Sequence, residues 1–549
     1  MKNIILSGLL LLVISCNNRP QTETGIVIPL APEQYRKPAG YDPAQYRYKY
    51  SLAELRERFS EQMMQQAAVQ YQKVAEVNEK GRWKATKESI DRHYAPEWFA
   101  DCKFGMWIDW GLWSVAGWAT PREEGAVYPD WYEFWFDADT VYPKEYQNVV
   151  KYHAKNWGKD FERDDFIPFF TAKNYQPEKL IDIAEIAGMK YVVPFCKHHS
   201  GFCLWPSSYT QRNAWDMTGK DLITPLVERC KEKGLKFGFY FSLEEWEYPI
   251  IDDDGELIYR KWAGYRIPYF EKLEKKASGK IAVRDYLKDY LIPQATEFID
   301  RYDPDLLWYD GDWDTPADDL ASYDIAAYYY NQAEGRKEVA VNDRYGTEDG
   351  KWLRSRRGDY YTDEYGDMKK EAIQTIHPWE EGRGISQSYG FNWEDTKDNI
   401  ITSKDFIQLF VDVVANGGNL LLLVNLDSQG ALPDIQEARL REIGQWLKIN
   451  GEGIYATRAY ATISEDQVYY TRSKDEKTVY AISVEWPGTQ LKIKSVQPKA
   501  GSSIYMLGYD QPLAWNYDNG ITTVAIPSNL QNESNRPCKD AYTFKIQKD

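Results

Sequence analysis

The chain has 549 residues with 67 Lys or Arg and 84 Asp or Glu, which gives a formal net charge of −17. This acidic balance argues against nucleic-acid binding and against docking on anionic lipid, because both need a basic face. Hydrophobic residues make up 43% of the chain, enough for a large core in two to four domains of roughly 150 residues each. The aromatic content of 15% also favours flat surfaces of the kind on which sugar rings stack.

Residues 1–16 have the pattern of an export signal. A basic start is followed by an apolar run at residues 4–14, which is too short to span a bilayer. Residues 13–16 (VISC) resemble a bacterial lipobox, in which Cys16 is lipidated and becomes the mature N-terminus; simple secretion with Cys16 removed is the alternative. We expect an exported lipoprotein at the periplasmic or cell-surface side of a bacterial membrane, with the lipid as its membrane contact.

Residues 17–94 are predicted to form a tether and a helical extension. The part from 17 to 50 is rich in Pro, Tyr and Gln and shows no periodicity. Ser51 and Glu54 fit a capping box, which indicates a helix running to about residue 78.

Residues 95–450 are predicted to form a (β/α)₈-like barrel. Short apolar runs alternate with amphipathic stretches such as 177–187 and 220–233, which is the pattern of parallel strands connected by helices. The candidate strands are 104–109, 190–196, 236–241, 305–310, 338–341, 359–362, 385–388 and 419–424.

Residues 451–549 are predicted to form an antiparallel β-sandwich. A last helix at 434–447 is followed by short alternating runs with turn residues between them. These runs are 467–471, 478–484, 490–494, 503–506, 522–526 and 541–546. The fold class is therefore α/β, with a catalytic barrel followed by this sandwich.

Polar and aromatic side chains follow the carboxyl ends of the predicted strands, where barrel enzymes hold their active sites. The chain has only five His and no CxxC pair, so we expect neither a metal site nor a cofactor. His198 and His199 are adjacent at a strand end and should point to opposite faces, which disfavours a metal-dependent hydrolase that uses both with a carboxylate. Asp310 precedes Gly311, so by itself it could simply belong to a turn. Carboxylates beside tryptophans favour carbohydrate chemistry.

The joint arrangement of these motifs resembles glycoside hydrolase family 29, the α-L-fucosidase family, over roughly residues 95–460. The motifs follow one another in the order found in that family. They are 96–105 (PEWFADCKFG), 110–115 (WGLWSV), 170–173 (FTAK), 187–193 (AGMKYVV), 197–202 (KHHSGF), 204–207 (LWPS), 234–240 (GLKFGFY), 306–311 (LLWYDG), 341–346 (VNDRYG), 379–380 (WE) and 417–422 (GGNLLL).

The resemblance implies a retaining exo-glycosidase that works through a covalent intermediate. Asp310 stands at the position of the family's nucleophile, and Glu380 matches the acid/base of many members. Because the position of the acid/base varies within the family, Glu364 and Glu381 are the alternatives. The family positions that hold the sugar are occupied here by Asp109, Asp130, Trp131, His198, His199, Tyr240, Trp308 and Arg344.

Three residues depart from the family pattern. Asp109 replaces a His before Trp-Gly, Asp130 replaces a Glu before Trp-Tyr, and Ser200 replaces an Asp after the His pair. The family's His helps to line the pocket for the C5 methyl group of fucose. A carboxylate would be desolvated without compensation against a methyl group, but would form a strong hydrogen bond with a hydroxymethyl group. L-Galactose is L-fucose with that extra hydroxyl.

The sequence therefore predicts an exo-α-L-glycosidase that releases terminal α-L-fucose or, slightly favoured by Asp109, α-L-galactose from glycans or algal galactans. In the alternative, Asp109 turns to a neighbouring donor and fucose remains the substrate. A different possibility is a non-catalytic carbohydrate-binding lipoprotein; the presence of both Asp310 and Glu380 counts against it. The expected partner in every case is an oligosaccharide or polysaccharide.

Overall fold

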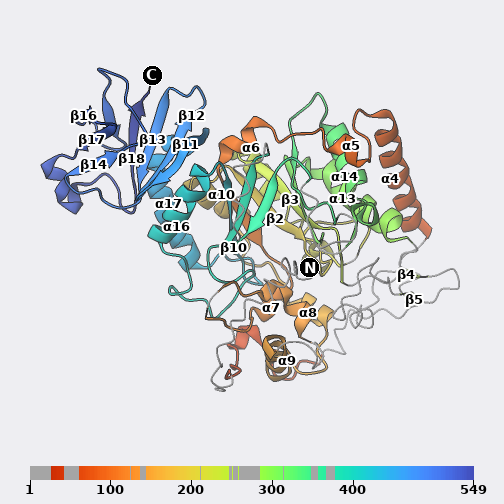
Figure 1. Ribbon diagram of the computed structural model, residues 1–549. Coiled ribbons are helices and arrows are strands. Elements are labelled where there is room, and N and C mark those ends of the chain that lie inside the picture. The colour runs from red at the N-terminus through yellow and green to blue at the C-terminus, as the bar shows by residue number, and fades with distance from the viewer. Residues whose placement is uncertain are drawn as a thin grey trace, which may run out of the picture.

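The computed structural model describes residues 26–42, 61–123, 125–136, 144–210, 212–246, 250–251, 257–258, 285–312, 315–347, 357–365 and 377–548. A barrel forms the larger part, and an antiparallel domain lies at one side of it (Figure 1). Cys16 and the capping box at Ser51 and Glu54 lie outside the described residues. Within the described ranges, no helix combines the length and the apolar composition needed to cross a bilayer.

Eight parallel strands form the barrel, which confirms the predicted fold class. Their order is β7-β6-β3-β2-β1-β10-β9-β8, and an isolated parallel bridge between Asn342 and Tyr360 joins the two edge strands. The strands are β1 (Phe104–Asp109), β2 (Tyr191–Lys197), β3 (Lys236–Ser242), β6 (Leu306–Asp310), β7 (Ala340–Val341), β8 (Tyr361–Glu364), β9 (Trp379–Gly384) and β10 (Asn419–Asn425). Burial on both faces explains why most of them are nearly continuous apolar runs.

The seventh strand lies elsewhere than the sequence predicts. The apolar pattern favours 385–388, whereas the structure forms β9 at Trp379–Gly384, with the sequence WEEGRG. Backbone pairing with β8 and β10, rather than hydrophobicity, defines this strand. Residues 385–388 instead make isolated bridges, such as that between Val127 and Ser388.

Helices cover the outside of the barrel. Phe104 of β1 packs against Phe406 and Phe410 of α16, with ring centroids 5.4 and 5.0 Å apart. The helix predicted from 220 starts later, because the Asp221 side chain accepts hydrogen bonds from the N–H groups of Ile223 and Thr224 and forms a capping turn. The helices are α4 (Glu61–Lys80), α5 (Lys87–Ile90), α6 (Glu97–Cys102), α7 (Trp113–Ala116), α8 (Tyr132–Trp135), α9 (Lys144–Asn156), α10 (Pro177–Ile186), α11 (Ala214–Thr218), α12 (Thr224–Lys233), α13 (Ile292–Tyr302), α14 (Ser322–Ala333), α16 (Ser403–Ala415) and α17 (Asp434–Asn450).

The C-terminal domain consists of two antiparallel sheets, as predicted. One has the order β11-β12-β13-β18-β15 and the other β14-β17-β16. The strands are β11 (Thr457–Glu465), β12 (Val468–Ser473), β13 (Thr478–Ser483), β14 (Gln490–Ile493), β15 (Ile504–Met506), β16 (Trp515–Asp518), β17 (Ile521–Ala525) and β18 (Tyr542–Gln547). The sequence did not indicate β11 and β16, which are edge strands with little burial and therefore no clear alternation.

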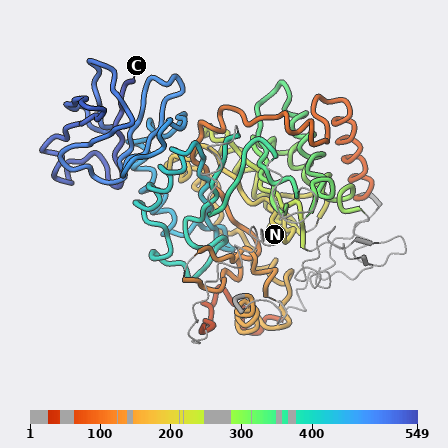
Figure 2. Tube along the Cα trace, viewed as in Figure 1, coloured from red at the N-terminus to blue at the C-terminus, as the bar shows by residue number. Residues whose placement is uncertain are grey.

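The C-terminal domain packs beside α16 and α17, which Figure 2 shows as the blue trace next to the cyan one. The Trp446 indole of α17 donates a hydrogen bond to the carbonyl of Ala541 at 3.0 Å. An exposed ion pair between Lys404 and Glu485, 2.7 Å apart, joins α16 to the same domain. This domain therefore contacts the helical shell and not the inner face of the barrel.

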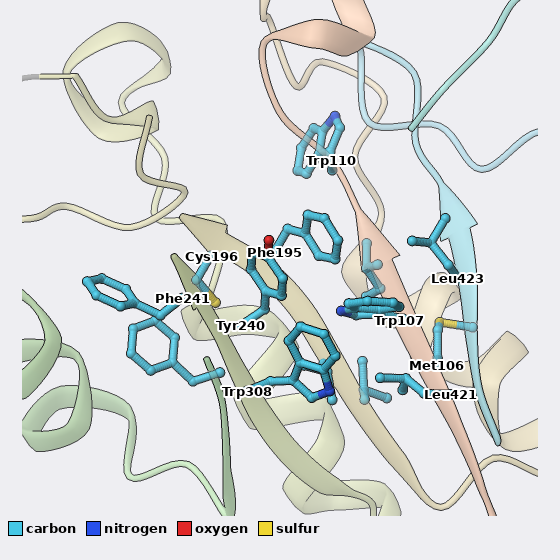
Figure 3. Close-up of a cluster of buried hydrophobic side chains, with 14 of the residues drawn as sticks. Met106, Trp107, Trp110, Phe195, Cys196, Tyr240, Phe241, Trp308, Leu421 and Leu423 are labelled. Carbon is cyan, nitrogen blue, oxygen red and sulfur yellow. The ribbon is translucent and has the colours of Figure 1, made fainter. Parts of the chain in front are cut away.

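Aromatic rings fill the inside of the barrel (Figure 3). Trp107 of β1 and Trp308 of β6 have ring centroids 4.5 Å apart, and Phe195 of β2 stacks on Tyr240 of β3 at 3.9 Å. Because side chains alternate along a strand, the residue two positions after Trp308, Asp310, shares its inner face. The rings thus form a rigid floor beneath the polar groups at the carboxyl ends of the strands.

Candidate active site

Asp310, the last residue of β6, is surrounded by hydrogen-bond donors. Its Oδ2 accepts from the Tyr240 hydroxyl at 2.6 Å, and its Oδ1 accepts from Arg344 Nη1 at 2.8 Å and from the Gly311 N–H at 2.9 Å. Burial would raise the pKa of Asp310, but the positive charge of Arg344 and these hydrogen bonds outweigh it and hold the pKa well below its usual value. Asp310 is therefore both part of the turn and an ionised carboxylate suited to nucleophilic attack.

Arg344, which follows β7, connects two carboxylates. Its Nη1 binds Asp310, its Nη2 binds Glu364 at the end of β8, and its Nε donates to Thr362 Oγ1 at 3.0 Å. The guanidinium lies over the ring of Trp308, with its carbon 4.3 Å from the ring centroid. A planar guanidinium with one carboxylate on each terminal nitrogen keeps the two carboxyl groups within roughly 7 Å of each other. Asp310 and Glu364 can therefore flank one glycosidic bond.

His198 and His199 lie on the same side of the sheet, contrary to the expectation for adjacent strand residues. The reason is that β2 ends at Lys197, so both residues belong to the following turn, with their ring centroids 4.0 Å apart. His199 Nε2 lies 3.7 Å from Asp310 Oδ2, and its Nδ1 lies 2.5 Å from the Ser242 hydroxyl. Burial lowers the pKa of His198 to about 3 and that of His199 well below its usual value, so both rings are neutral.

Glu380 is not at the mouth of the barrel, because it lies inside β9 rather than after a strand. It pairs in register with Thr362, two residues before Glu364, and therefore lies about 7 Å deeper. Its Oε1 accepts from the Trp308 indole at 2.8 Å and its Oε2 from the Tyr191 hydroxyl at 2.6 Å. Burial raises the pKa of Glu380 to about 7, although both hydrogen bonds oppose the shift. The raised pKa of Glu380 therefore results from its burial at the floor of the barrel and does not by itself indicate an acid at the mouth.

Glu381, the other alternative for the acid/base, alternates with Glu380 along β9 and so points to the opposite face of the sheet. Its Oε1 accepts from Arg383 Nε at 2.6 Å. Burial raises its pKa to about 7, and the positive charge of Arg383 opposes this. Among the three candidates named from the sequence, Glu364 is the one that shares a cation with Asp310.

A second group of carboxyls lies at the end of β1. Asp109 is fully buried; its Oδ1 accepts from the Trp113 indole at 2.8 Å, and its Oδ2 has no hydrogen-bond partner among the residues that the structure describes. Asp130 Oδ2 lies 3.5 Å from His198 Nε2, and Asp130 Oδ1 and His198 Nδ1 are likewise unpartnered and buried. Burial, followed by the charge of Asp130, raises the pKa of Asp109 well above its usual value. Burial, followed by the charge of Glu364, does the same for Asp130.

An aromatic wall borders the histidines. The ring of Trp131 lies 5.6 Å from that of His199 and 5.1 Å from that of Trp246, and both tryptophans are partly exposed. From the sequence, Trp131 is expected to bind the sugar, but no role is predicted for Trp246, nor for Trp113 and Ser242, which orient site groups. Asp109 ends β1 and Trp113 begins α7, and the short turn between them brings the two side chains together.

The comparisons with known proteins agree with this geometry. The family model described as Alpha-L-fucosidase matches residues 70–452, and the Alpha-L-fucosidase C-terminal domain model matches residues 462–547. An α-L-fucosidase of Branchiostoma floridae is 31% identical over 85% of this chain and 96% of its own length. The human plasma α-L-fucosidase is 32% identical over 85% of this chain and 92% of its own length.

The fold is also that of solved relatives. The crystal structure of Thermotoga maritima α-fucosidase in complex with a mechanism-based inhibitor superposes with a TM-score of 0.67 at 29% identity, covering 85% of this chain and 100% of that one. The extent of the family match and the barrel with its acidic mouth lead to one conclusion: the chain belongs to the α-L-fucosidase family, glycoside hydrolase family 29.

Proposed function

We propose that this family member is a retaining exo-α-L-glycosidase in which Asp310 is the nucleophile and Glu364, rather than Glu380, is the acid/base. The observation that carries the proposal is the single guanidinium of Arg344 that binds both Asp310 and Glu364. Retaining glycosidases need two carboxyl groups about 5 Å apart, one ionised and one able to transfer a proton. Glu380 is held too deep by Trp308 and Tyr191 to meet this requirement.

The reaction then has two steps. Asp310 Oδ attacks the anomeric carbon while the bond to the leaving oxygen breaks, and Glu364 donates its proton to that oxygen. Glu364, now ionised, takes a proton from water, whose oxygen attacks the anomeric carbon and releases Asp310. Tyr240, which donates to Asp310 Oδ2, and Arg344 stabilise the departing carboxylate in the second step. The sugar is released with its original anomeric configuration.

We also propose that the preferred sugar is α-L-galactose. The support is Asp109 Oδ2, a buried oxygen near Asp130 that has no hydrogen-bond partner within the described part of the chain. A buried polar atom left unpaired costs free energy, and the O6 hydroxyl of L-galactose would pair with it, whereas the methyl group of fucose would not. The alternative, in which Asp109 turns to a neighbour, has partial support, because its other oxygen accepts from Trp113.

Paired substrates test both proposals at once. Aryl α-L-galactoside and aryl α-L-fucoside with the same leaving group should both be cleaved, the galactoside with the higher kcat/KM. Proton NMR of the first product should show the α-anomer before mutarotation. A first product with the β-configuration would rule out retention, and a higher kcat/KM for the fucoside would rule out the galactose preference. No cleavage of either would favour the carbohydrate-binding alternative.

We infer further that the chain is exported and anchored through Cys16, on the strength of residues 13–16 alone. Labelled fatty acid should be incorporated into the wild-type chain expressed in a bacterial host and not into Cys16→Ser. The Cys16→Ser chain should be recovered from the soluble fraction with its glycosidase activity unchanged. Equal labelling of both chains would contradict the inference.

A further inference from the structure

Residues 26–42, called here the N-terminal strap, lie against the barrel even though the sequence predicts a tether. Asn156, at the end of α9, binds the strap on two sides. Its Oδ1 accepts from the Ala31 N–H at 2.8 Å, and its main-chain carbonyl accepts from the Lys37 N–H at 3.0 Å. Because the last carbonyls of a helix have no partner within the helix, these bonds give the strap a defined position.

Tyr35 projects from the strap onto a segment of the active-site wall. Its ring lies 5.4 Å from that of Phe391 and is nearly parallel to that of Trp393, at 6.4 Å. Residues 388–393, called here the wall segment, follow β9 and are also fixed from the other side. The Trp393 N–H donates to the Gly117 carbonyl at 2.9 Å, and its indole donates to the Tyr152 hydroxyl at 2.9 Å.

The wall segment touches the second group of carboxyls through Gly390. A Cβ atom at Gly390 would lie 2.7 Å from the Asp130 nitrogen and 3.1 Å from Trp113 Nε1, so the backbone packs directly on both residues. The φ of Gly390 is +93°, which also favours glycine. The Trp113 indole in turn holds Asp109 Oδ1, and the Asp130 N–H donates to the Tyr389 carbonyl at 3.2 Å.

We propose that Tyr35 is a positioning residue for substrate specificity. Its ring supports Phe391 and Trp393, which hold Gly390 against Trp113 and Asp130 and so fix the carboxyl of Asp109. None of the hydrogen bonds described above joins Asp310, Arg344 or Glu364 to these residues; the coupling between the two groups is the charge of Glu364 and Asp310 acting on Asp130. Tyr35 therefore affects how the enzyme distinguishes sugars that differ at C6 more than it affects bond cleavage.

The test is the ratio of kcat/KM for aryl α-L-galactoside to that for aryl α-L-fucoside. Tyr35→Ala should change this ratio by about three- to tenfold, because residues without ligand contact modulate coupling to that extent. The change should appear mainly in KM, with kcat for the fucoside within about twofold of wild type. Tyr35→Phe keeps the ring and should keep the wild-type ratio.

Tyr41→Ala is the matched control. Tyr41 also belongs to the strap, but its ring packs on Phe169 at 5.0 Å and Phe161 at 6.3 Å, away from the wall segment. Tyr41→Ala should lower the melting temperature without changing the ratio of the two kcat/KM values. If Tyr35→Ala does not fold, Tyr35→Leu removes the aromatic ring and its contacts with Phe391 and Trp393 while filling part of the space, and it should change the ratio in the same direction.

An unchanged ratio in Tyr35→Ala or its substitute, or an equal change in Tyr41→Ala, would overturn the proposal. The inference rests on the proposed function only in placing C6 near Asp109. If wild type prefers the fucoside and Asp109→His leaves the ratio unchanged, the galactose preference fails. The role of Tyr35 is still decided by comparing Tyr35→Ala with Tyr41→Ala.

Discussion

Two groups of carboxyl side chains lie at the carboxyl ends of the barrel strands, and they differ in what surrounds them. In the first, Arg344 binds Asp310 and Glu364, and the pKa of Asp310 is held below its usual value. In the second, Asp109 and Asp130 lie beside neutral His198, and burial raises the pKa of both. The same sheet thus holds one pair of carboxyl groups bound to a cation and a second pair that has no cation bound to it among the described residues.

The difference indicates a division of labour. A carboxylate that attacks a carbon atom must be ionised, and the cation beside Asp310 provides for this. A carboxyl that recognises an uncharged hydroxyl can also do so as a protonated acid, which both donates and accepts a hydrogen bond. Under the proposed function, the first group cleaves the bond and the second recognises the substituent at C6. Three experiments test this division, and a fourth tests the buried Glu380 at the floor of the barrel.

The largest effect is expected from Asp310→Gly. Removing the nucleophile should lower kcat by about 10⁴-fold or more, since water has no positioned carboxylate to replace. Azide should restore part of the activity and give a glycosyl azide of inverted configuration, measured by NMR. Near-normal turnover without azide would remove Asp310 from the mechanism.

Glu364→Gln and Glu380→Gln test which residue is the acid/base: Glu364 at the mouth of the barrel or Glu380 at its floor. Glu364→Gln should lower the rate by about 10²- to 10⁴-fold for substrates with poor leaving groups, which need protonation, and much less for activated aryl glycosides. Glu380→Gln should affect all leaving groups alike, because Glu380 contacts Trp308 and Tyr191. The measurement is kcat/KM across a series of aryl glycosides. A steeper leaving-group dependence in Glu380→Gln would restore the assignment made from the sequence.

Asp109→His tests the second group alone. It should lower kcat/KM for the α-L-galactoside by about 10²-fold, with 10⁴-fold as the upper end, and raise it for the α-L-fucoside. Both changes are needed, because the substitution exchanges a hydrogen bond to O6 for packing against a methyl group. Asp109→Asn, which retains an acceptor for Trp113, should keep more of the galactosidase activity. If neither rate changes in Asp109→His, the carboxyl faces away from C6.

The smallest effect concerns stability and pH. Because burial raises the folded-state pKa of Glu380 from 4.5 to about 7, the folded protein binds one more proton than the unfolded chain between these pH values. The contribution of Glu380 to stability is therefore fully present below pH about 4.5, and it is lost as the pH rises to about 7. The melting temperature of Glu380→Gln should fall less than that of wild type across this window. Parallel pH profiles would mean that Glu380 does not titrate there.

Much of the barrel could be predicted from the sequence, because a strand buried on both faces must be apolar. The runs 306–309 (LLWY) and 420–424 (LLLLV) are apolar throughout. The strand β9 is not, since its WEEGRG sequence is defined by pairing with its neighbours. The motif Trp379-Glu380, from which the family resemblance named the acid/base, does not tell how deep in the barrel Glu380 lies; the position of β9 does.

The sequence by itself determined the fold class and the family, because each depends on local patterns: apolar runs, turn residues and short motifs. The tertiary structure decided which groups meet. It brought Glu364 to Arg344 from a different strand, placed both histidines on one side, and gave one oxygen of Asp109 to Trp113. It also placed Tyr35 behind the wall segment, more than 350 residues away along the chain. Such contacts depend on strand register and on where each strand ends, and the local sequence pattern predicts neither of these.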